Sequence, residues 1–283
     1  MNCSHAQTDS KTASRLRTAG KKIAWDPAAY AANSSSQQGW ARELIAKLEL
    51  RGDERILDIG CGDGKVTAEL SRAVPNGGVI GIDSSAEMIQ FAGKTFPARK
   101  IPNLKFQIMD ARQIRFDRTF DLVFSNAALH WVDDHPAFLR GAAAVLRSGG
   151  RLVVSCGGRG NAQDVFVALR AELRLKRWRE FFRKVEAPYF FHAPDEYEKW
   201  LPRFGFKARS VQLADKDMIF ETREKFAGWF RTTWLPYTQR VPETQREEFV
   251  TAVVNRYVAR HPLDTTQRVH VRMVRLEIDA IKV

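Results

Sequence analysis

The 283-residue sequence has no apolar run approaching the roughly 20 residues that a membrane-spanning helix requires. Its first residues also lack the apolar core of a secretory signal, so we expect a cytoplasmic protein. Only three cysteines occur, Cys3, Cys61 and Cys156, which are too few for a disulfide framework. No group of cysteines and histidines has the spacing of metal ligands, so the sequence predicts no metal site. Internal repeats are absent, and nothing in the sequence indicates an oligomeric state.

Positive charge is present in excess, with 45 lysines and arginines against 33 acids and a net charge of +12. Residues 25–155 are nearly neutral, with 16 cations and 15 anions, whereas residues 156–283 carry 24 cations and 17 anions. Seven cations fall between Arg170 and Lys184, offset only by Glu172 and Glu180. Such a stretch is either a solvated helix face or an electropositive surface that attracts an acidic substrate or a polyanion.

Short apolar strands alternate with helical patterns between residues 40 and 155. The predicted strands are 55–59, 78–82, 104–109, 120–125 and 150–155, and the predicted helices are 40–50, 65–73, 85–94 and 138–146. Because the strands are nearly continuous apolar runs, they are typical of a parallel sheet covered by helices on both faces. The sequence therefore predicts an α/β fold.

The regular alternation of strands and helices ends after Cys156. Predicted helices span 164–184, 195–204, 223–233 and 243–260, and two further strands span 207–213 and 270–281. We expect residues 1–24 to form a disordered tail, residues 25–158 a Rossmann-like core with an N-terminal lid helix, and residues 159–283 a helical cap plus the last two strands.

A glycine-rich turn follows the first predicted strand, in the sequence ILDIGCGDG. Gly60, Gly62 and Gly64 would let a ligand lie against bare backbone near the positive end of the next helix. Their G-x-G-x-G spacing lacks the third glycine position of the dinucleotide fingerprint, which disfavours NAD. A purely structural turn without a ligand is the alternative.

Polar residues also end the next three predicted strands. Asp83 stands 19 residues beyond Gly64, where an acid can accept hydrogen bonds from both hydroxyls of a ribose. Asp110 with Ala111 could recognise an adenine edge, and Ser125 with Asn126 could hold an ammonium or amino-acid group. Ligands of open α/β sheets bind at these strand ends, so the sequence predicts one site there.

The motif series ILDIGCGDG, GIDSSAEMI, MDA, FDLVFSNAALHW and LRSGGRLVV resembles that of class I S-adenosylmethionine-dependent methyltransferases. The resemblance implies a seven-stranded, mostly parallel sheet with a reversed final hairpin. It also implies S-adenosylmethionine as cofactor and S-adenosylhomocysteine as product. The resemblance implies that Asp58, Gly60 and Gly62, with Ser125 or Asn126, contact the methionyl part, that Asp83 binds the ribose, and that Met88, Asp110 and Ala111 contact the adenine. Cys61 and Ser84 complete the predicted cofactor-binding set.

A closer resemblance extends beyond these motifs. Trp25-Asp26-Pro27, Tyr30, the segment SSSQ at 34–37 and His130-Trp131 are similar to trans-aconitate methyltransferases and juvenile hormone acid methyltransferases. Both groups methylate carboxylates. The resemblance therefore implies a small, anionic organic acid as the methyl acceptor.

A carboxylate nucleophile is already ionised at neutral pH and needs no general base. It needs orientation instead, and Gln37, His130 or the indole N–H of Trp131 could donate a hydrogen bond to the oxygen that does not attack. His130 could alternatively act as a base for a phenol or an alcohol. Tyr30 and Arg231 are candidate acceptor-binding residues, with Arg231 as a clamp for a second carboxylate.

Two other functions remain open from the sequence. The basic C-terminal half would suit an RNA or protein methyltransferase. The fourth strand, however, is followed by Ser125-Asn126-Ala127-Ala128 and lacks the Pro-Pro-aromatic run of amino-methylating nucleic-acid enzymes. The third possibility is a cofactor-binding partner protein without catalysis, against which Gln37 and His130-Trp131 argue.

Overall fold

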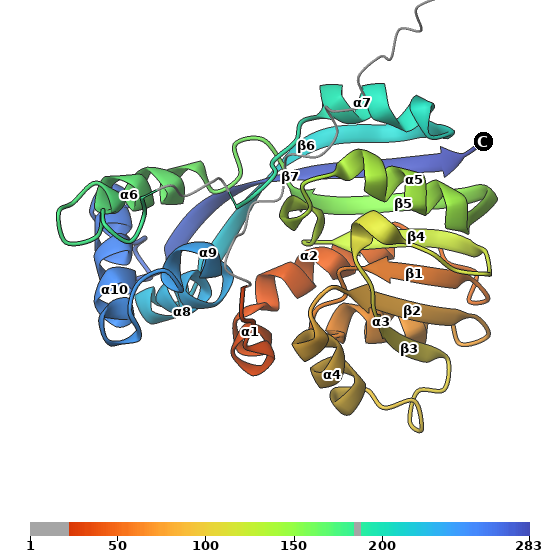
Figure 1. Cartoon of the computed structure of the whole chain (residues 1–283), viewed down its shortest axis with the longest axis horizontal. Coiled ribbons are helices and arrows are strands. Elements are labelled where there is room, and N and C mark those ends of the chain that lie inside the picture. The colour runs from red at the N-terminus through yellow and green to blue at the C-terminus, as the bar shows by residue number, and fades with distance from the viewer. Residues whose placement is uncertain (1–22, 184–187) are drawn as a thin grey trace, which may run out of the picture.

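A computed structural model describes residues 23–183 and 188–283, so residues 1–22 of the expected tail lie outside the described part. One seven-stranded sheet confirms the predicted α/β fold (Figure 1). Its strands are β1 (Arg55–Ile59), β2 (Gly78–Asp83), β3 (Leu104–Ile108), β4 (Phe120–Asn126), β5 (Leu146–Gly157), β6 (Phe206–Phe220) and β7 (Val269–Lys282). Their order is β3-β2-β1-β4-β5-β7-β6, so the chain reverses its direction across the sheet between β1 and β4.

The last hairpin is reversed, as the family resemblance implies. β1 to β5 pair in parallel, whereas β7 runs antiparallel to both β5 and β6. β6 is 15 residues long, about twice the predicted 207–213, and it pairs with β7 along its whole length. The last part of β6 and the first part of β7 extend beyond the core and pack against the C-terminal helices (Figure 1).

Helices cover both faces of the sheet, which explains the continuous apolar strands. On β1, Ile56 packs with residues of α2 (Ser35–Ala46) and α3 (Lys65–Ala73), while Leu57 packs with α5 (His135–Val145) and α7 (Pro194–Arg203) on the other face. α4 (Ala86–Thr95) packs beside β2 and β3. Within residues 23–183 and 188–283, none of the helices is both long and apolar enough to cross a membrane.

A helical cap packs on the far ends of β6 and β7. It consists of α6 (Gln163–Leu173), α8 (Arg223–Thr233), α9 (Leu235–Thr238) and α10 (Glu243–Arg260), which share one buried cluster with Met218, Val271 and Met273 of the two strands. The short helix α1 (Pro27–Asn33) contacts both α8 of the cap and α4 of the core. It lies where the core and the cap meet (Figure 1).

The helix predicted at 164–184 is wrong in length, because α6 ends at Leu173. The chain then turns so that Trp178, 1% exposed, packs against Phe249 of α10 at 5.3 Å between ring centroids. Trp178 Nε1 also donates a hydrogen bond to the buried Glu172. Burial of this indole outweighs continuation of the helical pattern.

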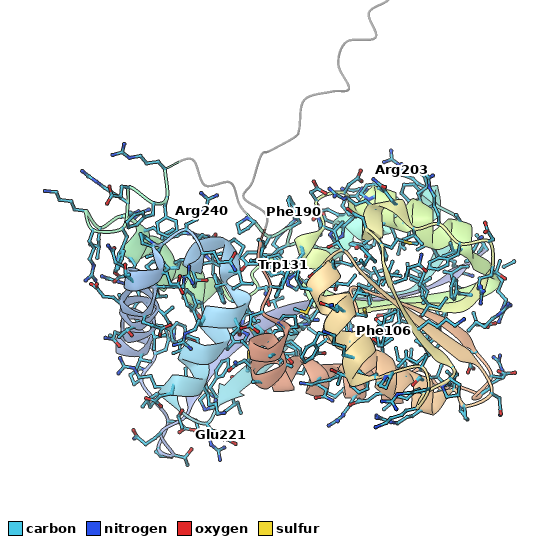
Figure 2. All side chains as sticks on the ribbon, turned by 60° about the horizontal axis from the view of Figure 1, so that its bottom comes forward. Phe106, Trp131, Phe190, Arg203, Glu221 and Arg240 are labelled. Carbon is cyan, nitrogen blue, oxygen red and sulfur yellow. The ribbon has the colours of Figure 1, made fainter. Side chains whose placement is uncertain are left out.

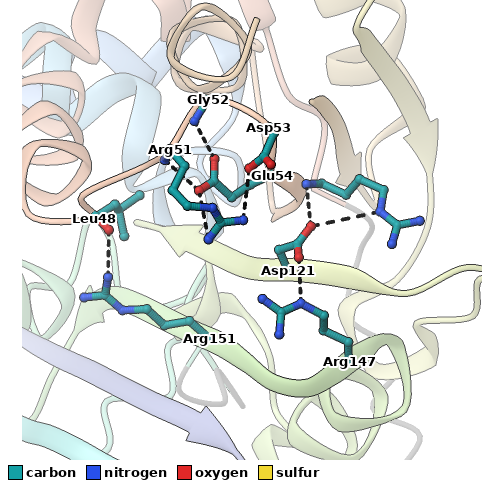
Figure 3. Close-up of polar contacts among 9 residues, drawn as sticks. Leu48, Arg51, Gly52, Asp53, Glu54, Asp121, Arg147 and Arg151 are labelled. Carbon is teal, nitrogen blue, oxygen red and sulfur yellow. Dashed lines mark hydrogen bonds and ion pairs between the residues drawn. The ribbon is translucent and has the colours of Figure 1, made fainter. Parts of the chain in front are cut away.

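Ion pairs and hydrogen bonds link the amino ends of β1, β4 and β5 (Figure 3). Asp121 accepts hydrogen bonds from the backbone N–H of Arg55 at 2.8 Å and from Arg147 Nε at 2.7 Å. Arg151 Nη1 donates to the backbone oxygen of Leu48 at 2.9 Å. These contacts join the segment before β1 to β4 and β5. They lie at the amino ends of the parallel strands, opposite the carboxyl ends at which ligands of such sheets bind.

Candidate active site

The turn between β1 and α3 borders a polar cavity of about 470 Å³ at the carboxyl ends of the strands. Gly60 adopts φ +72°, and a Cβ placed on it would lie 2.1 Å from the Cβ of Ala128. Its N–H and that of Cys61 donate to the Ile82 carbonyl at 2.8 and 3.0 Å, which joins the turn to β2. Only glycine fits at position 60, and the turn offers bare backbone to a ligand.

Two carboxyl groups flank this turn, the buried Asp58 and the half-buried Asp83. Asp58 accepts a hydrogen bond from Thr67 Oγ1 at 2.7 Å, and burial raises its pKa to about 7. Asp83 accepts from the backbone N–H groups of Gly62 at 3.1 Å and Ser85 at 2.8 Å. Burial raises the pKa of Asp83 as well. Asp83 therefore connects the glycine turn to the start of α4.

The structure brings some of the predicted cofactor-binding residues to this cavity and places others outside its lining. Ser125 is fully buried and donates to the Ile59 carbonyl at 2.9 Å. Asp110 is paired with Arg112 at 2.6 Å. The cavity is lined by Asp58, Gly60, Cys61, Gly62, Asn126, Tyr30 and Gln37, whereas Asp83, Ser84, Met88, Asp110, Ala111 and Ser125 are not part of the lining.

A second cavity of about 620 Å³, partly open to solvent, adjoins the first, and half of its described lining residues are aromatic. The two cavities share Tyr30, Gln37 and Ala127. The aromatic lining residues are Trp25, Tyr30, Trp40, Trp131, Phe166, Tyr189, Phe191, Trp229 and Trp234. They come from residues 25–40, the loop after β4, the segment 189–191 before α7 and the cap, so the cavity forms where the cap packs on the core.

Gln37 stands at the junction of the two cavities. Its backbone oxygen accepts a hydrogen bond from Asn126 Nδ2 at 3.1 Å, which fixes α2 against the end of β4. Its side-chain Oε1 is buried and has no hydrogen-bond partner among the described residues. In the polar cavity, Asp63 Oδ2 is a second buried oxygen without a hydrogen bond, although Lys65 Nζ lies 3.3 Å away. Asp63 Oδ2 therefore has an ion-pair partner, whereas Gln37 Oε1 has none. An unpaired buried acceptor is costly, so Gln37 Oε1 indicates a ligand with a donor group.

His130 and Trp131 both line the aromatic cavity, on the short helix η2 (Leu129–Trp131). Trp131 lies between the core and the cap (Figure 2), with its ring centroid 4.8 Å from that of Tyr189 and 5.4 Å from that of Trp25. His130 Nδ1 accepts a hydrogen bond from the Gly157 N–H at 3.3 Å. Burial, and secondarily the charge of Arg275, lower the pKa of His130 to about 3. The ring is therefore neutral at pH 7 and carries its proton on Nε2.

The predicted clamp residue Arg231 lies away from both cavities. It forms a two-bond ion pair with Glu247 of α10, at 2.6 and 2.5 Å, on the surface of the cap. The described cations of the 170–184 stretch do not line the aromatic cavity either. Arg177, for example, is paired with Glu172 and Glu248.

Sequence reasoning missed one charged residue of the cavity, Arg275 on β7. Its signal was available in the strand pattern, because Val271 and Met273 occupy the same face of the strand at two-residue spacing and are buried. An arginine two residues from a buried apolar residue of a strand lies on the same face, so its charge points inward. The aromatic wall contributed by the cap was missed as well.

Comparisons with known proteins agree with this geometry. Residues 56–150 match the family described as "Methyltransferase domain". An uncharacterized methyltransferase of Schizosaccharomyces pombe is 32% identical over 232 residues, which cover 78% of this chain and 86% of that protein. Trans-aconitate 2-methyltransferase of Escherichia coli is 27% identical over 264 residues, covering 90% and 97%. Among solved structures, the YcgJ protein of Bacillus subtilis has a TM-score of 0.59 at 20% identity, covering 88% of this chain and 98% of that one.

The chain therefore belongs to the class I S-adenosylmethionine-dependent methyltransferases. It is an enzyme of this class, and S-adenosylmethionine is its methyl donor. The polar cavity fits that cofactor, because a glycine turn at a helix start lines the same space as Asp63 and as Gln37, whose buried Oε1 has no hydrogen-bond partner among the described residues. Among the residues described, no cluster of histidine, cysteine and acidic side chains could hold a metal ion.

Proposed function

We propose that this methyltransferase transfers a methyl group to a carboxylate oxygen of a small organic acid bound in the aromatic cavity. The observation that carries the proposal is the absence of a base there. No aspartate or glutamate belongs to the described lining, and the only histidine, His130, has a pKa lowered to about 3. An alcohol, a phenol or an ammonium group must lose a proton to become a nucleophile, whereas a carboxylate is already ionised.

The relatives named trans-aconitate 2-methyltransferase support an acid as acceptor. Their name describes an enzyme that acts on a carboxylic acid, and one of them aligns with 90% of this chain. Nucleic acid and protein acceptors are less well supported, since the described cations of the 170–184 stretch do not line the aromatic cavity.

In this proposal the polar cavity holds the cofactor. S-adenosylmethionine supplies a methyl group on a sulfonium, which a nucleophile can displace in line. The glycine turn and Asp58 face its methionyl part, with Gln37 Oε1 and Asp63 Oδ2 as acceptors for its ammonium group. The adenosyl part extends beyond the lining of this cavity, where Asp83 accepts from the ribose hydroxyls and Met88 with Asp110 and Ala111 borders the adenine, as the family motif implies.

The aromatic cavity orients the acceptor and excludes water. His130 Nε2–H and the indole N–H of Trp131 are the hydrogen-bond donors that η2 contributes to this wall. Tyr30 and Gln37 line both cavities, so they contact both ligands when both are bound. Holding a nucleophile and a methyl group in line within a closed site accounts for much of the rate of such a displacement.

The test is to incubate the enzyme with radiolabelled S-adenosylmethionine and a panel of organic acids, and then to treat the products with mild base. A methyl ester releases its label as volatile methanol under these conditions. The matched control is the Gly60→Ala variant, which we expect to lose the cofactor. A product whose label survives base treatment would contradict the proposal, because N-methyl and ether O-methyl groups are stable to base.

A further inference from the structure

Arg275 is a buried cation in the wall of the aromatic cavity, with only 2% of its surface exposed. Its Nη2 donates to the Ser155 backbone oxygen at 2.6 Å, and its Nε donates to Ser155 Oγ at 3.2 Å. Its Cζ lies 5.2 Å from the ring centroid of Trp40, so the guanidinium also makes a cation–π contact. These contacts fix the position of the guanidinium.

Arg275 forms no ion pair among the described residues, although the charge of Glu277, two residues further along β7, acts on it at longer range. Among the described residues, no carboxylate oxygen lies within 4.0 Å of its guanidinium nitrogens, and Nη1 makes no hydrogen bond. A buried charge without a partner is costly, and an arginine cannot escape the cost by losing its proton. The fold therefore maintains a buried cation without an ion pair, whose Nη1 is free to bind an anion from outside the chain.

The rest of the cavity carries no compensating or additional charge. His130 is neutral, and the other lining residues of the described chain are aromatic, aliphatic, thioether, amide or hydroxyl side chains. One cation among apolar walls suits one anionic group on an apolar body. A polycarboxylate would place its remaining carboxylates against aromatic rings, where they lack partners.

Arg275 also lies beside the junction of the two cavities. Its Nη2 is 3.4 Å from Asn126 Oδ1, and Asn126 in turn bonds the backbone of Gln37, which lines both cavities. An anion bound at Arg275 is therefore next to the boundary across which methyl transfer must occur.

We propose that Arg275 binds the carboxylate of the methyl acceptor, and that the acceptor is an acid with a single carboxylate on an apolar body. The inference rests on the proposed carboxyl methylation and deepens it. A guanidinium paired with one carboxylate oxygen leaves the other free to attack, so Arg275 contacts the reacting group itself.

The experiment measures acid binding in the presence of S-adenosylhomocysteine. Five of the seven tryptophans line the cavity, so their fluorescence reports its occupancy. The probes are straight-chain acids from hexanoate to dodecanoate, 3-phenylpropionate, the amide and alcohol of each, and trans-aconitate. The variants are Arg275→Gln, Arg275→Lys and, as a matched control, Arg272→Gln, which removes an exposed arginine of the same strand that pairs with Asp215.

We expect at least one monocarboxylate to bind the wild type more tightly than its amide, its alcohol and trans-aconitate. Arg275→Gln should weaken acid binding about 10- to 100-fold, the size of a lost charge-assisted hydrogen bond, while changing amide binding less than about threefold. Arg275→Lys should restore part of the acid affinity, and Arg272→Gln should leave it unchanged. Titration with S-adenosylhomocysteine should give similar affinities for all variants, since Arg275 is not part of the polar cavity.

Three results would overturn the inference. The first is equal loss of acid and amide binding in Arg275→Gln, which would make the arginine structural. The second is tighter binding of trans-aconitate than of every monocarboxylate. The third is ester formation by Arg275→Gln with an unchanged KM for the acid, which would leave the proposed carboxyl methylation intact. Failure of the proposed function itself is distinct, because it appears as a base-stable product of the wild type.

Discussion

A single backbone hydrogen bond decides what His130 can do. The Gly157 N–H occupies Nδ1, and the low pKa of the ring, about 3, keeps it neutral with its proton on Nε2. In this state the side chain is a hydrogen-bond donor to the cavity and a poor proton acceptor. Its role in the proposed reaction is to orient the acid.

This role predicts a particular pH dependence. With saturating cofactor, kcat/KM for the acid should show no acidic limb near pH 6.5, where an ordinary histidine titrates. His130→Gln, which keeps an N–H donor, should retain most of the activity, whereas His130→Phe should lose about 10- to 100-fold. Both variants should have the pH profile of the wild type. A limb near pH 6.5 that disappears in His130→Gln would show instead that the histidine is a base.

At the scale of elements, the turn between β1 and α3 depends on one glycine. Gly60→Ala would place a methyl group 2.1 Å from Ala128 Cβ and force a φ of +72° on a residue with a side chain. We expect it to destabilise the fold by about 2 to 4 kcal/mol, from overpacking and left-handed backbone strain. We also expect S-adenosylhomocysteine binding to be lost, as calorimetric titration would measure.

The matched control for this change is Gly93→Ala in α4. A Cβ at Gly93 meets nothing within 4 Å, and the residue lies inside a helix. This substitution should stabilise the protein by about 0.5 to 1 kcal/mol and leave cofactor binding unchanged. Equal thermal stabilities of the two variants would contradict the proposed packing of the turn.

The elements differ in how far the sequence predicts them. Strands β1, β2 and β4 are apolar runs bounded by turn residues, and their predicted limits lie within a residue of the observed ones. The second half of β6 was missed, because residues 214–220 (ADKDMIF) group three charged residues before three apolar ones, without the alternation of a strand. They pair with the part of β7 that leaves the core. The helix at 164–184 was overextended because the burial of Trp178 depends on Phe249, a residue 71 positions further along the chain.

At the scale of the whole molecule, two buried histidines make stability depend on pH. His135 is fully buried, with Nε2 bonded to the Leu129 carbonyl at 2.9 Å and Nδ1 to the Tyr197 hydroxyl at 2.6 Å. Burial, with a smaller effect of His192, lowers its pKa to about 4. Burial also lowers the pKa of His130, so this residue changes stability with pH in the same direction. Because the folded pKa lies below that of the unfolded chain, about 6.5, this stability is complete above pH 6.5 and is lost as the pH falls.

For His135 alone, the loss between about pH 7 and pH 5 should be about 2 kcal/mol in the free energy of unfolding. Urea denaturation at both pH values measures it. His135→Gln should be less stable than the wild type at pH 7 but lose less on acidification. The comparison between the two proteins cancels the contribution of Asp58, whose pKa of about 7 acts in the opposite direction. Equal acid losses in both proteins would contradict the burial of a neutral His135.

The polar cavity and the aromatic cavity also differ in how far the sequence predicts them. The glycine turn and Asp58 are local in sequence, so the polar cavity could be predicted from one motif and its neighbours. The aromatic cavity collects residues from positions 25 to 275. Its parts become neighbours only when the cap packs on the core, so no short motif could predict Arg275, Phe166 or Tyr189 as members of one wall.

The long β6–β7 strand pair helps to form the aromatic cavity, whereas the glycine turn belongs to a distant part of the chain. β7 is at once an inner strand of the sheet and, through Met273 and Arg275, part of the wall of the aromatic cavity, in which we propose that the acceptor binds. The glycine turn and Asp58 lie more than 200 positions earlier in the chain. Inward-facing residues of β7 can therefore change acceptor preference while the cofactor cavity stays constant, which makes this strand the first place to look when designing a methyltransferase for another acid.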